Sequence, residues 1–128
     1  MSENATYDHT VLIADDDLDM LGLLRSVLRE KRVRILEAND GDEAMALVLE
    51  HDPDLVILDV MMPGQSGWEV CRSIRDRPDV HTTKVIMLTG IGQRMNEMTS
   101  PLYGADAYMD KPFEVDELSA LVDQLLSA

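Results

Sequence analysis

The stretch that decides the fold is Val11-Leu12-Ile13-Ala14-Asp15-Asp16-Asp17, in which four apolar or small residues run directly into three acids. A short apolar run bounded by polar residues is typical of a strand buried on both faces, although a buried helical turn gives the same pattern. Three carboxylates this close together repel one another unless a cation or a basic side chain compensates them. The stretch therefore indicates a buried strand that ends in an acidic cluster.

Four more strand-like runs follow this one and alternate with helical patterns. The predicted strands cover residues 11–14, 34–38, 55–58, 84–88 and 107–109. The predicted helices cover residues 18–28, 39–50, 67–75, 94–103 and 118–125, with Pro101 weakening the fourth. Strands that alternate with helices predict a parallel sheet with right-handed crossovers and helices on both faces.

Polar side chains follow the predicted strands where each one ends. Ligands of such sheets bind outside the carboxyl ends of the strands, at one edge. The residues that fall just past strand ends are Asp15, Asp16, Asp59, Thr89 and Lys111. Their convergence predicts a metal-assisted phosphoryl site, although each residue alone has a plainer explanation, such as helix capping by Asp15 and Asp16.

Length, composition and charge narrow the class of protein. With 128 residues and 45% hydrophobic residues, the chain suits one folded domain, which we place at residues 10–127 after a flexible N-terminus at 1–9. Its net charge of −14 disfavours direct binding to nucleic acid or anionic lipid. No apolar run approaches a membrane span, no secretory signal is visible, and Cys71 is the single cysteine. These features favour a cytoplasmic protein.

Several motifs, in order and at matching distances, are shared with one known family. They are Asp15-Asp16, the run Val56-Ile57-Leu58-Asp59-Val60-Met61-Met62-Pro63-Gly64, Thr89-Gly90, Gly104-Ala105-Asp106 and Lys111-Pro112-Phe113. Over residues 10–127 the chain resembles the receiver (CheY-like) domain of two-component response regulators. The resemblance implies a flavodoxin-like α/β fold: a doubly wound five-stranded parallel sheet of order 2-1-3-4-5 with five helices.

The resemblance also implies a phosphoacceptor and its helpers. Asp59 would be the nucleophile that takes a phosphoryl group from a histidine kinase or a histidine phosphotransfer protein. Lys111 would pair first with the Asp59 carboxylate and then with a phosphoryl oxygen. The Thr89 hydroxyl would donate to another oxygen, and Gly90 would let the backbone approach closely. The chain would catalyse its own phosphorylation and dephosphorylation without being a conventional enzyme.

The cofactor implied by the resemblance is Mg²⁺, a hard cation that prefers oxygen ligands and retains several waters. Asp16 and Asp59 would bind it directly, Asp15 through water, and the backbone carbonyl of Met61 would complete the protein's share. Such a cation neutralises the charge that develops during phosphoryl transfer. Asp17 is expected to cap the first helix and not to bind the metal.

Signalling in the family depends on a conformational switch, here expected at Thr89 and Tyr108. Phosphorylation would draw the Thr89 hydroxyl toward the phosphoryl group, and Tyr108 would follow inward. The face formed by the fourth helix, fifth strand and fifth helix would then change its affinity for a downstream protein or output domain, or dimerise. An ordinary strand tyrosine is nearly as good an explanation of Tyr108. The kinase, the target and the question of a stand-alone protein or a larger regulator stay open.

Other classes of protein share parts of this pattern. A haloacid-dehalogenase-like phosphatase also uses acids at alternate positions after its first strand, but the chain is short for that fold and Asp59 would lack a role. A calcium loop starting at Asp15 would need glycine at Met20 and glutamate at Ser26. A flavodoxin-like electron carrier would need a hydroxyl-rich loop after the first strand. A receiver-like binding module that is never phosphorylated remains an alternative.

Overall fold

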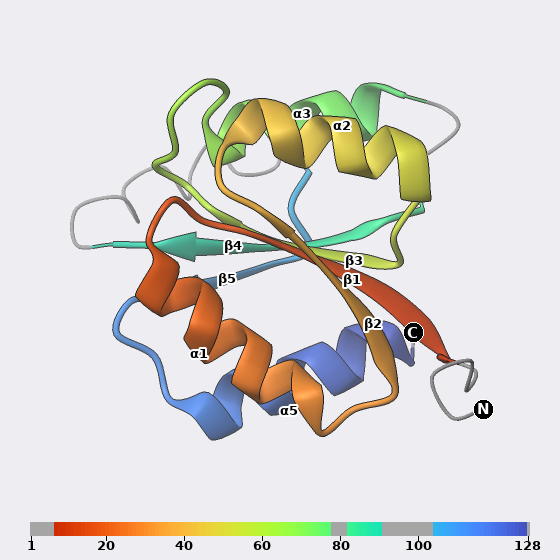
Figure 1. The fold of residues 1–128 in the computed structure, drawn as a ribbon, viewed down its shortest axis with the longest axis vertical. Coiled ribbons are helices and arrows are strands. Elements are labelled where there is room, and N and C mark those ends of the chain that lie inside the picture. Colours follow the sequence, from red (N-terminus) through yellow and green to blue (C-terminus); the bar gives the residue numbers. More distant parts are fainter. Residues whose placement is uncertain (1–6, 78–81, 91–103, 128) are drawn as a thin grey trace.

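Strands and helices alternate along the chain in the computed structural model, which describes residues 7–77, 82–90 and 104–127 (Figure 1). The elements are β1 (His9–Ala14), α1 (Leu18–Arg29), β2 (Val33–Ala38), α2 (Gly41–His51), β3 (Leu55–Asp59), α3 (Gly67–Asp76), β4 (Lys84–Thr89), β5 (Ala107–Asp110) and α5 (Val115–Leu126). The helix predicted at 94–103 lies outside the described residues. The first strand begins at His9, within the segment expected to be flexible.

The five strands form one parallel sheet in the order β2-β1-β3-β4-β5, as predicted. Helices α2 and α3 cover one face of this sheet, and α1 and α5 cover the other (Figure 1). Because every strand runs in the same direction, all carboxyl ends meet at one edge of the sheet. The polar residues that follow the strands are therefore brought to that edge from distant parts of the sequence.

The core confirms that the central strands are buried on both faces. Val11, Leu12, Ile13 and Ala14 have no exposed surface, and neither does the apolar part of β3. Alternate residues of each strand point to opposite faces. Leu12 and Ala14 join the cluster beneath α2 and α3, whereas Val11 and Ile13 join the cluster beneath α1 and α5. A helical turn could not divide its side chains in this way.

Side-chain caps fix where the helices begin, just after the strands. The Asp17 side chain accepts a hydrogen bond from the Asp19 N–H at 2.9 Å, which confirms its predicted capping role at α1. A capping box is present at α3, where the Ser66 and Glu69 side chains each accept the other residue's backbone N–H. The early start of α1 leaves only residues 15–17 between β1 and the helix, so Asp15 and Asp16 have little freedom.

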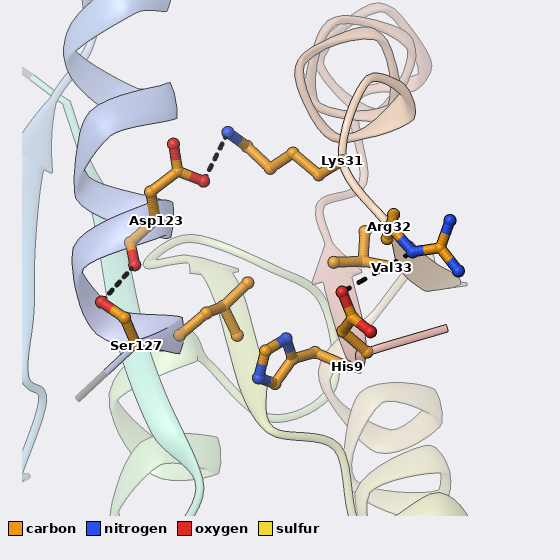
Figure 2. A pocket seen from close by; sticks show the side chains of 8 residues that line it. His9, Lys31, Arg32, Val33, Asp123 and Ser127 are labelled. Carbon is orange, nitrogen blue, oxygen red and sulfur yellow. Dashed lines mark hydrogen bonds and ion pairs between the residues drawn. The ribbon is translucent and has the colours of Figure 1, made fainter. Parts of the chain in front are cut away.

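One basic residue just after α1 is not simply solvated. Lys31 has a side chain only 13% exposed, and its Nζ donates to Asp123 Oδ1 of α5 at 2.8 Å. It forms part of a pocket of about 220 Å³ at the amino edge of the sheet, opposite the acids (Figure 2). The pocket's lysine and its arginine, Arg32, are both in ion pairs, so it offers no unused positive charge.

No helix among the described residues is long and apolar enough to cross a membrane.

Candidate functional site

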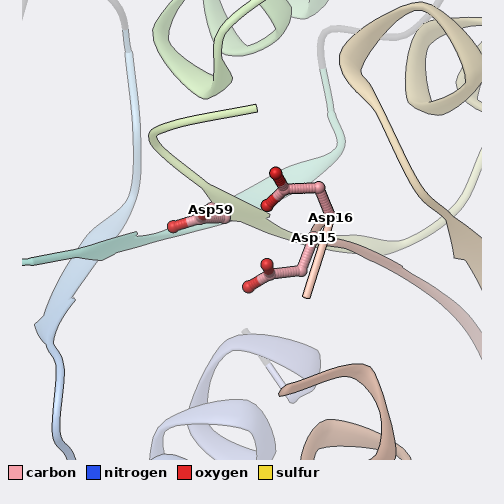
Figure 3. Close-up of side chains that lie close together, drawn as sticks. All are labelled: Asp15, Asp16 and Asp59. Atoms are coloured by element: carbon pink, nitrogen blue, oxygen red, sulfur yellow. The ribbon is translucent and has the colours of Figure 1, made fainter. Parts of the chain in front are cut away.

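Three carboxylates meet at the carboxyl edge of the sheet. Asp59 is the last residue of β3, and Asp15 and Asp16 directly follow β1, whose Ala14 lies in register with Leu58. One oxygen from each acid lies within 4.8 Å of the others. Figure 3 shows the three side chains close together. Asp15 is 0% and Asp59 6% exposed, whereas Asp16 is exposed. The structure thus brings together the three acids that the sequence predicted to converge.

One lysine faces this acidic cluster. Lys111 follows β5, and its Nζ lies 2.8 Å from Asp59 Oδ1 and 3.4 Å from Asp15 Oδ2. The backbone N–H of Lys111 donates to the Thr89 carbonyl at 2.6 Å, which ties the start of this loop to β4. A single ammonium group therefore serves two buried carboxylates, and the third acid adds further negative charge.

Burial and the neighbouring charges shift the pKa values of Asp15, Asp59 and Lys111. Burial raises the pKa of Asp59 above its usual range, and the hydrogen bond from Lys111 only partly opposes this effect. Burial also raises the pKa of Asp15, and the charge of Asp59 adds to it. Burial alone would lower the pKa of Lys111, but the bond and charge of Asp59 and Asp15 raise it. The lysine stays protonated, and among the described residues three acids face this one positive charge.

The donor set suits a hard divalent cation. Mg²⁺ prefers oxygen ligands, usually one or two carboxylates with several waters, and the cluster offers three carboxylates, one of them exposed. No histidine or cysteine belongs to the group, so the softer ligands typical of zinc are missing from it. The excess negative charge and the all-oxygen donors fit the predicted cation on chemical grounds.

The remaining predicted residues lie around this cluster. Thr89 ends β4 and is 1% exposed, and Gly90 directly follows it. Met61 lies in the loop after Asp59 with a side chain that is 63% exposed. Tyr108 is half-buried on β5, where its ring packs against the buried ring of Trp68 with centroids 5.9 Å apart.

Two features of the structure, one at the site and one away from it, were not predicted from the sequence. The Thr89 hydroxyl donates to Asp110 Oδ1 at 2.8 Å, so the residue before Lys111 takes part in the site. Its position at the end of β5, in register with Thr89, could have indicated this contact. Away from the acids, Arg75 of α3 donates to the carbonyls of Thr83 and Gly104 and to the Asp106 carboxylate. That clamp joins α3 to the residues just before β4 and just before β5.

Close backbone contacts hold the loop that follows Asp59. The Gly41 N–H at the start of α2 donates to the Pro63 carbonyl at 3.1 Å, and the Gly67 N–H donates to the Val60 carbonyl at 2.9 Å. A Cβ on Gly41 would lie 1.9 Å from the Gln65 carbonyl oxygen, a distance that no packing tolerates. Only glycine lets α2 and this loop approach so closely.

Comparison with known proteins gives one consistent family. Residues 11–123 match the family described as the response regulator receiver domain. The chain is 41% identical over 94% of its length to the transcriptional regulatory protein ResD of Bacillus subtilis and 38% identical over 91% to CpxR of Klebsiella pneumoniae. It covers 49% and 48% of those proteins, so it spans about half the length of the curated relatives it matches.

A solved structure supports the same assignment. The signal receiver domain of a histidine kinase from Syntrophus aciditrophicus superposes with a TM-score of 0.86 at 32% identity, covering 93% of this chain and 90% of that one. The chain therefore belongs to the response regulator receiver domain family, and the predicted flavodoxin-like fold and strand order are confirmed. Receiver domains of this family work in two-component signal transduction, where they interact with histidine kinases and output domains.

Proposed function

We propose that this chain is a phosphoacceptor receiver that takes a phosphoryl group onto Asp59 from a histidine kinase or a histidine phosphotransfer protein. The observation that carries the proposal is the Asp59 carboxylate 2.8 Å from Lys111 Nζ and within 4.8 Å of two more carboxylates. Its domain spans residues 10–127, and it acts in the cytoplasm. Its output is a change in affinity for a downstream protein or an attached output domain.

The transfer is a displacement at phosphorus. An Asp59 carboxylate oxygen forms a bond to the phosphorus of a phosphohistidine, the P–N bond breaks, and the imidazole leaves with the electron pair. Lys111 moves its hydrogen bond from the carboxylate to a phosphoryl oxygen, and Thr89 donates to another. Hydrolysis of the acyl phosphate by water returns the carboxylate and releases inorganic phosphate, so the chain catalyses both reactions on itself.

Mg²⁺ would be held by Asp16 and Asp59 directly, by Asp15 through water and by the Met61 carbonyl. When bound, it supplies the positive charge that three acids and one lysine lack, both in the resting site and as charge develops on the phosphoryl oxygens. Lys111 orients the Asp59 carboxylate through the 2.8 Å bond, and the burial of Asp59 excludes much of the competing water.

Phosphorylation would act as a switch because it adds about −1.5 to −2 charge at one buried point. Thr89 and Tyr108 are the residues proposed to carry the change to the surface of the fourth helix, β5 and α5. The packing of Tyr108 against Trp68 supports an inward path, since this ring is already half-buried. Dimerisation through the same surface is one possible output.

The test is the intact mass of the protein after incubation with Mg²⁺ and acetyl phosphate. One added phosphoryl group is expected, and it should be absent from Asp59→Asn and from a reaction that contains EDTA. Asp54→Asn is a matched control, because Asp54 is an exposed acid before β3 and should not affect the adduct. A folded protein that takes no adduct from acetyl phosphate, binds no beryllofluoride and accepts nothing from a histidine kinase would indicate the binding-module alternative. Turnover of phosphate monoesters would indicate the phosphatase.

A further inference from the structure

The hydroxyl proposed to contact the phosphoryl group is already engaged in the structure. Thr89 Oγ1 donates to Asp110 Oδ1 at 2.8 Å, and the side chain of Thr89 is almost fully buried. The two residues lie opposite each other in the register of β4 and β5. The backbone bond from the Lys111 N–H to the Thr89 carbonyl holds the two strand ends together beside this contact. The Thr89–Asp110 pair is therefore built into the end of the sheet.

The chemistry of a hydroxyl makes this contact exclusive. A threonine hydroxyl has one proton to donate, so it cannot donate to Asp110 and to a phosphoryl oxygen at the same time. A carboxylate is also a strong acceptor, because hydrogen bonds to ionised groups are shorter and stronger than neutral ones. A phosphoryl group on Asp59 must therefore displace a charged competitor before it gains the Thr89 hydroxyl.

We propose that Asp110 is a positioning residue that holds the Thr89 hydroxyl in the unphosphorylated protein and competes for it with the phosphoryl group. The inference rests on the proposed function of Asp59 and assigns a regulatory role to an acid that none of the predicted metal or phosphoryl contacts includes. Asp110 biases the equilibrium between the two states of Thr89 toward the resting one. The chain thereby accepts a phosphoryl group less readily than a receiver without this acid.

Asp110 can oppose a phosphoryl group in two ways that must be separated. Its negative charge repels any anion at Asp59, whatever residue stands at position 89. Its hydrogen bond, by contrast, depends on the hydroxyl of Thr89. A comparison of Asp110 variants with and without that hydroxyl isolates the hydrogen bond from the charge.

The experiment measures the Mg²⁺-dependent affinity for beryllofluoride, a phosphoryl analogue, by titration calorimetry. Four proteins are compared: the unchanged chain, Asp110→Ala, Thr89→Ala and the double variant. Asp110→Ala should tighten binding about tenfold, the lower end of what a bond to a charged acceptor contributes. In the Thr89→Ala background the same change should tighten binding much less, since only the charge remains.

Two further variants keep the test decisive. Thr89→Ser retains a hydroxyl and should restore the large effect of Asp110→Ala, which a purely structural role of Asp110 would not do. Asp110→Asn keeps the shape of the side chain and should increase the affinity for beryllofluoride by an intermediate factor. It replaces Asp110→Ala in the comparison if that variant does not fold.

The outcomes distinguish this inference from the proposed function. An equal fold-change in the Thr89 and Thr89→Ala backgrounds would overturn the role of Asp110 while leaving Asp59 as the acceptor. If the unchanged protein binds no beryllofluoride and takes no phosphoryl group, the proposed function fails, and the role of Asp110 fails with it.

Discussion

Replacing Asp15 by asparagine should stabilise the metal-free protein and remove its response to Mg²⁺. Asp15 has no exposed surface, and its Oδ1 accepts the Asp17 N–H at 2.9 Å, a bond that the asparagine carbonyl can also accept. The substitution therefore removes a charge while keeping the shape and the bond from the Asp17 N–H, and it loses only the long 3.4 Å bond that Asp15 Oδ2 accepts from Lys111. It also removes the carboxylate proposed to hold Mg²⁺ through a water, so stability and function should change in opposite directions.

The magnitude follows from the charges around Asp15. At an effective dielectric constant of about 20, a second carboxylate within 4.8 Å repels it by at least ~3.5 kcal/mol. Lys111 at 3.4 Å attracts it by ~4.9 kcal/mol. These two terms nearly cancel, and the cost of burying the charge then outweighs the small difference. We expect Asp15→Asn to raise the free energy of unfolding by about 1 kcal/mol, or the melting temperature by about 4 °C.

The stability gained by Asp15→Asn must depend on pH, because burial and the charge of Asp59 raise the pKa of Asp15. With a folded-state pKa above the unfolded value, the folded protein binds the proton more tightly than the unfolded chain. The resulting stability is complete below the unfolded value of about 3.9 and is lost as pH rises through the folded pKa. The advantage of Asp15→Asn should therefore be present at pH 7 and disappear near pH 4.

Thermal unfolding in EDTA at both pH values, followed by the same measurement with Mg²⁺, tests this reasoning. Mg²⁺ should raise the melting temperature of the unchanged protein and not that of Asp15→Asn. Asp16→Asn is the control: this acid is exposed, so its removal should weaken Mg²⁺ binding with little gain in stability. A gain equal at pH 4 and pH 7 would show that shape and not charge is responsible. A loss of stability at pH 7 would refute the argument.

Two further predictions concern the packing around the site. Gly41→Ala should cost about 2 kcal/mol and weaken Mg²⁺ binding, because its Cβ would meet the Gln65 carbonyl at 1.9 Å and displace the loop after Asp59. Gly22→Ala, whose Cβ meets nothing nearer than 3.9 Å, should instead stabilise α1 by about 0.5–1 kcal/mol; chemical denaturation that moved both variants alike would contradict this. Arg75→Met should cost about 2–3 kcal/mol, since it removes the Arg75 bonds to two carbonyls and to the Asp106 carboxylate, which would still accept the Val85 N–H. The exposed Arg72, on the same helix, is its control, and a similar loss in Arg72→Met would count against the clamp.

The sequence could predict the sheet and the acidic cluster because both depend on local patterns and one general rule. Apolar runs such as residues 55–58 identify buried strands, and parallel strands place their carboxyl ends at one edge. The caps at Asp17 and Ser66 were predictable for the same reason, since each depends on residues no more than three positions away. Local sequence patterns were therefore sufficient to predict these features.

Contacts between side chains and partners that lie far away in the sequence could not be predicted in this way. Lys31 could have been solvated, and only the approach of α5 gives it Asp123 as a partner. Arg75 reaches two carbonyls and Asp106 because α3 ends beside the residues that precede β4 and those that precede β5. In each case the residue type allows many different partners, and the three-dimensional packing determines which of them are contacted.

Thr89 shows why this distinction matters for function. The sequence places a hydroxyl at the end of β4, but it does not say which acceptor holds the proton. In the structure that acceptor is Asp110, at 2.8 Å, while Lys111 beside it is held by Asp59. Asp110 and Lys111, next to each other at the end of β5, therefore have opposite effects. Lys111 already contacts the proposed phosphoacceptor Asp59, whereas Asp110 holds the Thr89 hydroxyl that would have to move. A phosphoryl group would give Lys111 a new acceptor in place of the carboxylate and would break the Thr89–Asp110 bond. The difference between the free energies of these two changes determines how far phosphorylation shifts the domain toward its active state.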